Sequence, residues 1–282
     1  MVDVLVVGAD GLIGSALMER LPQQGLTVRG TSRRHECTPE LYLDLADEPA
    51  TWQLPAVIKS AVICAGIVNV VGCERQPQAT RKINVERTCL LIDQLQRRGA
   101  KVLYLSSNIV FSGDTPRVAA DCLPDPRCEY GRQKVAVERY LEDRDCGFQV
   151  LRLGKVVEGA MEIASHWAET AAEGGVVTPF ADFYFSPVPL SLVTSVIAGL
   201  LDKKLQGIFH LTARDEVSYL QLANHWAERH PEVVVKATRA DSIPELNFFS
   251  RQYAALDCNV LVEAQGIELP LSASMLDEMV SD

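Results

Sequence analysis

The sequence has few of the features that would indicate a membrane, an oxidising compartment or a metal. Its longest apolar stretch, residues 61–73, is too short to span a bilayer and is interrupted by Asn69. None of the eight cysteines forms a C-x-x-C pair and no signal-peptide pattern precedes them, so we expect reduced, buried thiols in a cytoplasmic protein. The five histidines lack the spacing of metal ligands, and we expect no metal site.

Positive charge is also in deficit. The chain has 27 Lys and Arg against 37 Asp and Glu, a formal net charge of -10 and a pI of about 5.1. This balance disfavours nonspecific binding to nucleic acid or to an anionic membrane, so we expect neither as a partner. With 282 residues, 48% of them hydrophobic, and no internal repeat, the chain can form one large α/β domain or one domain with a smaller annex.

Glycine is concentrated near the start, where the segment VDVLVVGADGLIGSAL places Gly8, Gly11 and Gly14 at three-residue spacing. A β-branched apolar run precedes Gly8, as in a strand buried on both faces, and a helical pattern begins at Ile13. In such a turn Gly8 takes a conformation closed to other residues, Gly11 lets the main chain approach a ligand, and Gly14 lets the helix pack on the strand. The unpaired amides that start the helix would hold a pyrophosphate, although any tight turn favours glycine.

Predicted strands and helices alternate along the chain as far as Gly154. This order indicates the α/β class with a parallel, doubly wound (Rossmann) sheet. The predicted strands are Leu26–Arg33, Ser60–Gly66, Lys101–Ser107, Phe148–Gly154 and Gly207–Thr212, and the predicted helices are Ala79–Gly99, Tyr130–Arg144, Leu190–Leu201 and Ser218–Arg229.

We expect the sheet to form a dinucleotide-binding domain over residues 1–155, completed by residues 189–212. Residues 156–188 and 213–282 are expected to form a smaller C-terminal lobe that binds the substrate. Residues 177–189 (VTPFADFYFSPVP), nearly all of them in this lobe, are rich in aromatics and prolines and predict a loop-built wall of a pocket.

Three side chains suggest proton transfer coupled to hydride transfer. Tyr130 and Lys134 are four residues apart in a predicted helix, so they lie on one face, one turn apart. Ser106 and Ser107 end a predicted buried strand, at the edge where doubly wound sheets bind ligands. A phenol has a pKa near ~10, and a neighbouring ammonium such as that of Lys134 would stabilise its ionised form. The hydroxyl of Ser107 would hold a substrate oxygen beside the phenol.

The end of the second predicted strand indicates which cofactor the turn would take. Sites that prefer NAD usually carry a carboxylate there, which accepts hydrogen bonds from the ribose 2'-hydroxyl. Here the segment GTSRRHE places Ser32, Arg33 and Arg34 at this position, and the first acid, Glu36, comes too late. A guanidinium grips a 2'-phosphate, so we expect NADP (NADPH) rather than NAD(H), with Arg33 as the stronger candidate. The alternative is an exposed loop without function.

The chain resembles the extended short-chain dehydrogenase/reductases, and within them the dTDP-4-dehydrorhamnose reductase-like family. The segments that carry the resemblance are GADGLIG, AGIVNVVGCE, INVERT, LSSNIVFSG, PRCEYGRQK, SPVPLSLV, GIFHLT and LDCNVLVEAQGIELP, which cover nearly the whole chain in order. LSSNIVFSG matches an S-[ST]-D-x-V-F-x-G element whose second hydroxyl residue is catalytic, here Ser107. PRCEYGRQK matches P-x-x-x-Y-G-x-x-K, which carries the catalytic roles to Tyr130 and Lys134.

The resemblance implies an NADPH-dependent reductase whose partner is a small-molecule sugar nucleotide. In such enzymes the nicotinamide delivers hydride to a keto carbon, the tyrosine protonates the oxygen, the hydroxyl residue orients it, and the lysine holds the nicotinamide ribose and lowers the pKa of the tyrosine. The cofactor-binding residues assigned on this basis are Gly8, Asp10, Gly11, Leu12, Ile13, Ser32, Arg33, Arg34, Asp44, Leu45, Cys64, Ala65, Gly66 and Lys134. Asp44 and Leu45 match the pair that contacts adenine, although a capping role for Asp44 and a core role for Cys64 are alternatives.

Some positions depart from the family pattern and leave the sugar undefined. Asn108 and Val71 stand where the family usually has aspartate, and Glu129 places a carboxylate directly before Tyr130. Because neighbours on a helix point about 100° apart, we expect Glu129 to face solvent.

Other functions stay open at this point. An NAD(P)-dependent sugar-nucleotide epimerase could use the same trio of side chains. A non-catalytic dinucleotide-binding subunit is a further alternative, because the regulatory β subunit of methionine adenosyltransferase resembles the same family. The oligomeric state is also open, with a homodimer as one alternative.

Overall fold

The computed structural model describes residues 1–34, 41–144, 147–203 and 205–281. The chain divides into two compact units, each built from several segments. Unit 1 contains residues 1–110, 126–152 and 191–209, and unit 2 contains residues 111–125, 153–190 and 210–282. The division into a cofactor-binding and a substrate-binding part stays a prediction.

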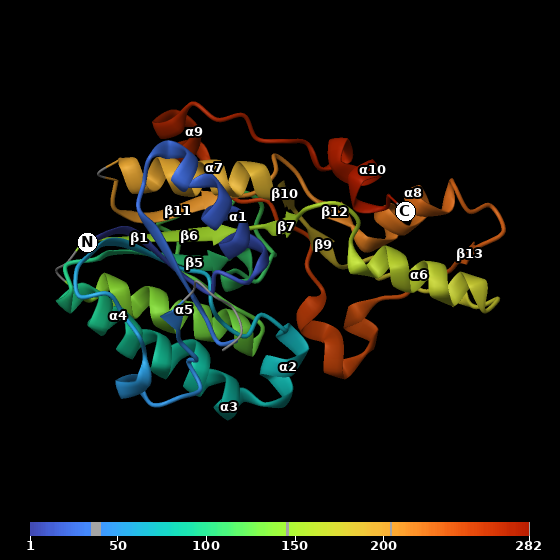
Figure 1. Cartoon of the computed structure of the whole chain (residues 1–282). Coiled ribbons are helices and arrows are strands. Elements are labelled where there is room, and N and C mark those ends of the chain that lie inside the picture. Colours follow the sequence, from blue (N-terminus) through green and yellow to red (C-terminus); the bar gives the residue numbers. More distant parts are fainter. Residues whose placement is uncertain (35–40, 145–146, 204, 282) are drawn as a thin grey trace. The chain divides into compact units, whose positions relative to one another are not determined.

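Unit 1 is built on a seven-stranded sheet with the strand order β11-β6-β5-β4-β1-β2-β3 (Figure 1). The strands are β1 (Val2–Val7), β2 (Val28–Ser32), β3 (Leu41–Tyr42), β4 (Ile58–Ile63), β5 (Lys101–Ser107), β6 (Phe148–Leu153) and β11 (Gly207–Leu211). Strand β1 pairs in parallel with β2 and β4, β2 with β3, and β4 with β5. The predicted doubly wound α/β fold is confirmed.

Helices cover both faces of this sheet, with α4 and α5 on one face and α1 and α7 on the other (Figure 1). The helices of unit 1 are α1 (Leu12–Arg20), α2 (Val70–Arg75), α3 (Pro77–Arg81), α4 (Thr88–Arg97), α5 (Glu129–Glu142) and α7 (Leu190–Asp202), with a π-helix η3 (Lys82–Arg87) and 3-10 turns η1 (Pro22–Gln24), η2 (Pro49–Thr51) and η4 (Asn108–Val110). Leu5, Ile63 and Val102 from the sheet pack with Leu91 and Leu141 from α4 and α5, and all five are buried. This burial stabilises the layered arrangement.

The predicted elements differ from the structure mainly at their ends and in one helix. Strand β5 covers the predicted range Lys101–Ser107, whereas the helix predicted over Ala79–Gly99 is divided into α3, η3 and α4. The wider η3 turn brings the Asn84 side chain back to the loop after β4, where it bonds the backbone of Ile67. Single π turns of this kind often occur at functional sites.

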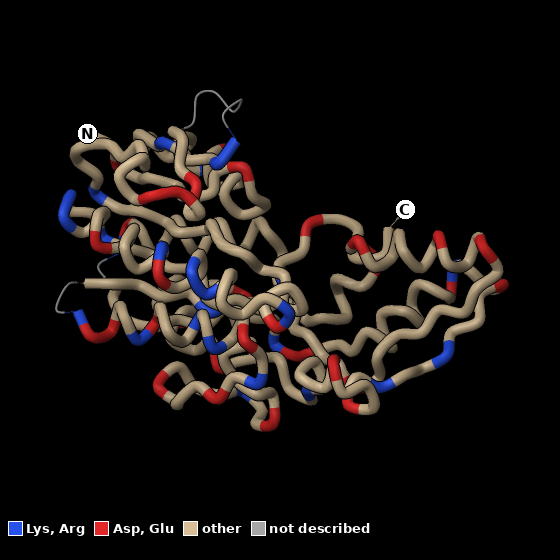
Figure 2. Tube along the Cα trace, turned by 90° about the horizontal axis from the view of Figure 1, so that it is seen from below, with Lys and Arg blue, Asp and Glu red and all other residues tan. Residues whose placement is uncertain are grey.

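Lys and Arg residues lie among Asp and Glu residues along the trace of the chain (Figure 2). None of the helices in the described part of the chain has both the length and the apolar composition that a membrane crossing requires.

The six cysteines within the described residues are free thiols. Cys73, Cys128 and Cys258 are buried and Cys64 and Cys89 are half-buried, but Cys122 is exposed, so the expectation of burial is wrong for Cys122. Cys122 lies between Asp121 and Leu123 in a segment without regular structure. Cys37 and Cys146, like His35 and Glu36, lie outside the described residues.

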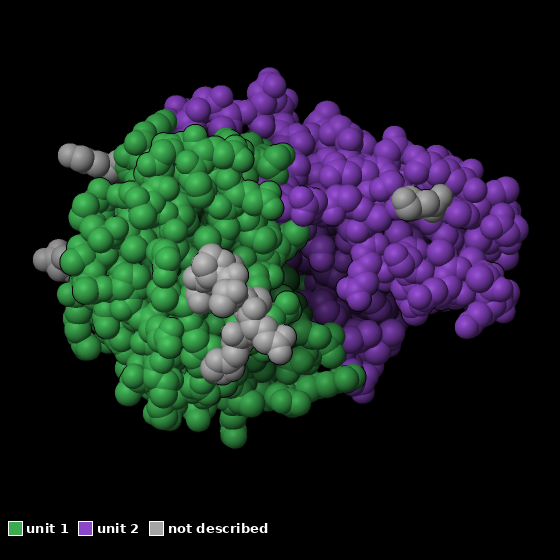
Figure 3. Space-filling model, viewed as in Figure 1, with its two compact units in different colours: residues 1–110, 126–152, 191–209 green, residues 111–125, 153–190, 210–282 purple. Residues whose placement is uncertain are grey.

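Unit 2 is the second compact body of the chain (Figure 3). Its elements are β7 (Lys155–Val157), α6 (Glu162–Ala172), β8 (Val176–Val177), β9 (Tyr184–Phe185), β10 (Pro187–Pro189), β12 (Val217–Ser218), α8 (Tyr219–Ala227), β13 (Val234–Val235), η5 (Ala240–Ser242), η6 (Pro244–Phe249), α9 (Asn259–Gln265), η7 (Ser272–Met275) and α10 (Leu276–Met279). The segment predicted as a loop at residues 177–189 contains strand residues that pair in three small ladders. Trp167 and Trp226 are buried in the core of this unit, with ring centroids 5.9 Å apart.

Candidate active site

The strand order of unit 1 reverses between β1 and β4, and this reversal defines where a ligand can enter. Both strands run in the same direction, so their carboxyl ends lie side by side. The glycine turn follows β1, and Cys64 to Gly66 follow β4. The amides of Cys64 and Ala65 donate to the carbonyl of Val7 at 2.9 and 3.0 Å and so hold the two strand ends together. Open α/β sheets bind ligands in the crevice outside such a switch point.

The glycine turn has the shape of a dinucleotide cradle. Gly8 has a φ of 85°, and a Cβ on it would lie 2.9 Å from the amide nitrogen of Ala65. A Cβ on Gly14 would lie only 2.1 Å from the Gly8 carbonyl oxygen, so helix α1 packs against the turn at backbone distance. At Gly11, the residue directly before α1, a Cβ would meet only the Gly8 oxygen, at 3.5 Å, and no side chain caps the helix. The first amides of α1 can therefore receive a phosphate, and the residues here fit a dinucleotide.

The residues beside this turn have different exposures. Asp10 and Gly11 are exposed, and Leu12, an apolar residue, is 47% exposed. Ile13 is half-buried where the helix begins. The exposed residues form a surface that a bound cofactor could cover.

The predicted 2'-phosphate residues lie at the end of β2. Arg33 is exposed, and the Arg34 guanidinium, with a side chain 66% exposed, pairs with the Asp10 carboxylate at 3.3 Å. Ser32 is buried, and its hydroxyl accepts a hydrogen bond from the Arg34 amide at 3.0 Å. Ser32 therefore shapes this corner, whereas the two guanidinium groups are accessible to a phosphate.

Asp44, Leu45 and Cys64 have structural contacts of their own. The Asp44 carboxylate accepts a hydrogen bond from the amide of Ala46 at 2.8 Å, and its carbonyl accepts one from the Trp52 indole at 2.7 Å. Leu45 is buried in the core of unit 1. Burial raises the pKa of the Cys64 thiol to about 12, so this sulfur stays protonated. Their contact with the cofactor stays a prediction.

The structure places the three predicted catalytic side chains on adjacent elements of unit 1. Tyr130 and Lys134 lie in the first two turns of α5, and both are buried. The Lys134 ammonium donates to the carbonyl of Leu105 in β5 at 2.8 Å and lies 5.5 Å from the centre of the Tyr130 ring. Ser107 ends β5, and its half-buried hydroxyl accepts a hydrogen bond from the Ile109 amide at 3.3 Å.

Burial controls the protonation of this group. Burial lowers the pKa of the Lys134 ammonium to about 8, while the Glu138 carboxylate opposes that effect. Burial also raises the pKa of the Tyr130 phenol above its ordinary value. This direction is opposite to the lowering that was expected from Lys134, and its largest cause is the loss of hydration on burial. The phenol therefore holds its proton at neutral pH and can donate it.

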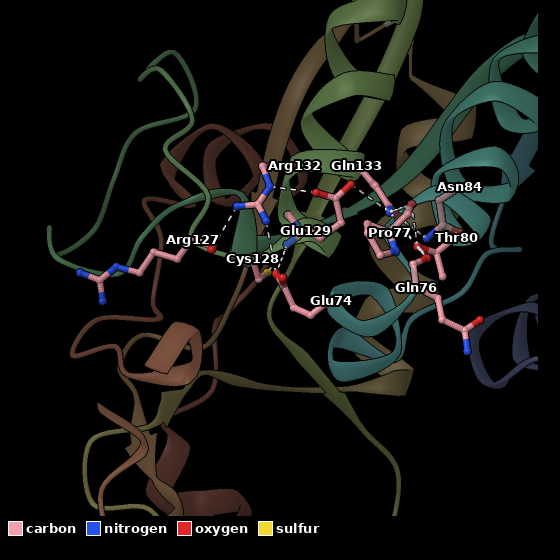
Figure 4. Close-up of polar contacts among 11 residues, drawn as sticks. Glu74, Gln76, Pro77, Thr80, Asn84, Arg127, Cys128, Glu129, Arg132 and Gln133 are labelled. Carbon is pink, nitrogen blue, oxygen red and sulfur yellow. Dashed lines mark hydrogen bonds and ion pairs between the residues drawn. The ribbon is translucent and has the colours of Figure 1, made fainter. Parts of the chain in front are cut away.

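The expectation that Glu129 faces solvent is wrong. Its side chain is only 14% exposed and contacts the Arg132 guanidinium at 2.9 Å and the Gln133 amide at 3.2 Å (Figure 4). The Glu129 amide donates to the carboxylate of Glu74, from α2. These contacts hold the carboxylate against neighbouring elements, which helical periodicity alone does not reveal.

Gln133 and Asn84 were not recognised from the sequence as parts of the site. Gln133 is fully buried, and its amide nitrogen donates to the hydroxyl of Thr80 at 2.9 Å, while its oxygen accepts from Asn84 at 2.8 Å (Figure 4). Asn84 in turn bonds the amide and carbonyl of Ile67, at 2.8 and 2.9 Å. The catalytic helix is thus joined to the loop after β4. The signal for Gln133 in the sequence was its place as a polar residue directly before Lys134.

Among the residues that the structure describes, no three His, Cys, Asp or Glu side chains group as metal ligands.

Comparisons with known proteins match most of the chain. The family model described as the RmlD substrate binding domain matches residues 2–282. A probable low-salt glycan biosynthesis reductase of Haloferax volcanii is 28% identical over 225 residues, which cover 76% of this chain and 75% of that protein. The rat methionine adenosyltransferase 2 subunit beta is 27% identical over 240 residues, with 78% and 70% covered.

A solved structure shows the same fold. The dTDP-4-dehydrorhamnose reductase of Bacillus anthracis in complex with NADP superposes with a TM-score of 0.79 at 20% identity and covers 98% of both chains.

Proposed function

The chain belongs to the RmlD substrate binding domain family, and we propose on this premise that it is an NADPH-dependent oxidoreductase of the extended short-chain dehydrogenase/reductase kind that reduces a keto sugar nucleotide. The observation that carries the proposal is the position of the Lys134 ammonium. It is buried beside the Tyr130 ring in the same unit as the glycine turn. Burying a charged group costs free energy, so a buried ammonium with no function would only destabilise the fold. Binding of the cofactor ribose and stabilisation of the reacting phenol give this charge a function.

The first amides of α1 would hold the cofactor, whose phosphates approach the main chain at Gly11. Arg33 and Arg34 would bind its 2'-phosphate. A bound nicotinamide supplies the hydride for reduction of a keto carbon. Bacillus anthracis dTDP-4-dehydrorhamnose reductase, which shares the fold, is described in complex with NADP. This supports the same choice of cofactor here.

The side chains of this chain perform the proton transfer. The Ser107 hydroxyl donates a hydrogen bond to the keto oxygen and orients it toward α5. The Tyr130 hydroxyl, protonated because of its burial, gives its proton to that oxygen as negative charge develops there. The nearby Lys134 ammonium then stabilises the phenolate that is left. The proton is recovered from solvent after the alcohol departs.

The test is consumption of NADPH with dTDP-, UDP-, GDP- and CDP-linked 4-keto sugars, by wild type and by Tyr130→Phe. Loss of a general acid costs about 10²- to 10⁴-fold in turnover, so Tyr130→Phe should lose that much while its NADPH dissociation constant is unchanged. Tyr140→Phe is the matched control. It removes the hydroxyl of another tyrosine on the same helix, and that hydroxyl bonds the Asp93 carboxylate at 2.7 Å. Wild-type turnover in Tyr130→Phe would show that the acid is another group.

A regulatory, non-catalytic subunit is the second candidate, because relatives named methionine adenosyltransferase 2 subunit beta match this chain as well as the named reductase does. That function predicts a protein partner that co-purifies and no turnover with any sugar nucleotide. A sugar-nucleotide epimerase would differ from both, since it would retain its cofactor through each cycle and consume none.

A further inference from the structure

A buried polar cluster lies one turn beyond Lys134 on α5, and the mechanism above does not use it. The cluster consists of Glu138 from α5, Arg152 from β6 and Ser106 from β5. The side chains of Glu138 and Arg152 are 1% and 2% exposed. All three residues belong to unit 1.

The contacts within this cluster fix the Glu138 carboxylate in place. The Arg152 Nη2 lies 2.7 Å from one carboxylate oxygen, and its Nε lies 3.2 Å from both. The Ser106 hydroxyl donates to the other oxygen. Two neighbouring strands thus hold a carboxylate beneath the catalytic helix. Because Ser106 directly precedes Ser107, the same contact also anchors the end of β5 where the predicted catalytic hydroxyl lies.

Burial of this ion pair needs a reason beyond stability. A buried pair is often no more stabilising than well-packed apolar side chains of similar volume, because both ions lose their hydration. The position of the pair on α5 gives such a reason. Residues four apart on a helix are neighbours, so the carboxylate of Glu138 lies on the face of α5 that carries Lys134.

The surroundings of Lys134 leave Glu138 as its strongest source of negative charge. The Lys134 ammonium bonds the Leu105 carbonyl and lies near the Tyr104 and Tyr130 rings. Glu138 of α5, Cys64 after β4 and Cys73 of α2 act on it electrostatically. Burial lowers the pKa of Lys134 to about 8, and of the groups that oppose this Glu138 contributes most. Without the carboxylate, Lys134 would lose its proton at a lower pH.

We propose that Glu138, held by Arg152 and Ser106, is a positioning residue that keeps Lys134 protonated and in place for cofactor binding and proton transfer. This inference rests on the proposed function for its consequence in turnover. Its electrostatic part concerns Lys134 alone and can be measured without cofactor or substrate.

The experiment compares wild type with Glu138→Gln. The first readout is an NMR titration of the unliganded protein with ¹³C-labelled lysine, in which Lys134→Met identifies the signal of Lys134. An opposite charge within about 4 to 6 Å shifts a pKa by about 1 to 3 units, and residues four apart on a helix are neighbours, so the Lys134 titration should move about one unit lower in Glu138→Gln. The second readout is the NADPH dissociation constant against pH. Because the protonated lysine binds, affinity falls as pH rises through the pKa of Lys134, and this fall should begin about one unit lower in the variant.

Two further variants separate this role from a structural one. Glu142→Gln, an exposed position one turn further along α5, is the matched control and should leave both readouts unchanged. Glu138→Gln combined with Arg152→Met removes both buried charges, so it stays testable if the single variant does not fold. It should still shift the Lys134 titration downward, by less than the single variant.

An unchanged Lys134 titration in a folded Glu138 variant would overturn the proposal, even if the free energy of unfolding falls, because the pair would then act on stability alone. A shifted titration in a protein that binds no NADPH would refute the proposed function and the positioning role in turnover, and would leave the electrostatic coupling established. The two failures are therefore distinguishable.

Discussion

Substitution of Gly14 tests the glycine turn directly. A Cβ on Gly14 would lie 2.1 Å from the Gly8 carbonyl oxygen and 2.9 Å from the Ala9 Cα. Both are backbone atoms, so no side-chain rotation can relieve the clash, and helix α1 must move away from β1. Overpacking of this kind costs about 1 to 3 kcal/mol, and the better helix propensity of alanine offsets at most about 1 kcal/mol of that cost. We expect Gly14→Ala to lower the free energy of unfolding by about 2 kcal/mol, and to weaken NADPH binding because the first amides of α1 are displaced.

Gly11→Ala is the matched control for this prediction. Its Cβ would meet only the Gly8 oxygen, at an ordinary 3.5 Å, and its φ of -87° suits any residue. Its free energy of unfolding should stay within about 0.5 kcal/mol of wild type. The NADPH dissociation constant should still rise at least about tenfold, because the methyl group takes the space through which the main chain approaches the ligand. Urea denaturation and fluorescence titration measure the two quantities. Wild-type stability in Gly14→Ala, or equal destabilisation in both variants, would refute the assignment of roles.

Two further predictions concern the cofactor corner and the buried amide network. Arg33→Ala combined with Arg34→Ala should weaken NADPH by about tenfold to a hundredfold for each charged hydrogen bond lost and leave NADH unchanged, while Asp10→Asn should tighten NADPH relative to NADH. Paired dissociation constants measure both, and a double variant that keeps its preference would contradict the assignment. Gln133→Ala should lower the free energy of unfolding by about 1 to 3 kcal/mol, because it removes the partner that Asn84 has at 2.8 Å. Gln78→Ala, at an exposed position, is the control, and equal stability of the two variants in urea would count against the network.

The parts of the fold that sequence patterns predicted are those with a strong local signal. Strand β5 is a continuous apolar run ended by two serines, and its predicted limits agree with the structure. The glycine spacing predicted a strand-to-helix turn whose close approaches the structure shows at Gly8 and Gly14. Side chains four residues apart on α5 also lie as predicted, because the helix period alone places Tyr130 and Lys134 on one face.

The parts that were not predicted depend on contacts between distant segments. The π-helix η3 lies inside a pattern that fits a continuous α-helix, and the wider turn is accompanied by the bonds of Asn84 to Ile67 and Gln133. Glu129 should face solvent by helical angle, yet Glu74 and Arg132 border it and limit its exposure. In the sequence, Glu138 and Arg152 are charged residues without a distinguishing pattern. They are buried together because α5 packs against the sheet.

The cofactor corner shows how a distant contact changes the energetics of a site. Among its described residues, the segment after β2 holds no carboxylate. The glycine turn nevertheless brings one there. The amides of Gly8 and Ala9 donate to the Thr31 carbonyl at 3.2 and 2.8 Å, and the Asp10 carboxylate that follows pairs with Arg34. A carboxylate here would accept a hydrogen bond from a ribose hydroxyl and would repel a 2'-phosphate. An ion pair as exposed as this one contributes about 0 to 1 kcal/mol, whereas a hydrogen bond from Arg34 to a phosphate contributes about 1.5 to 3 kcal/mol. Arg34 should therefore exchange Asp10 for the phosphate, so the preference for NADPH persists but is smaller than it would be without Asp10.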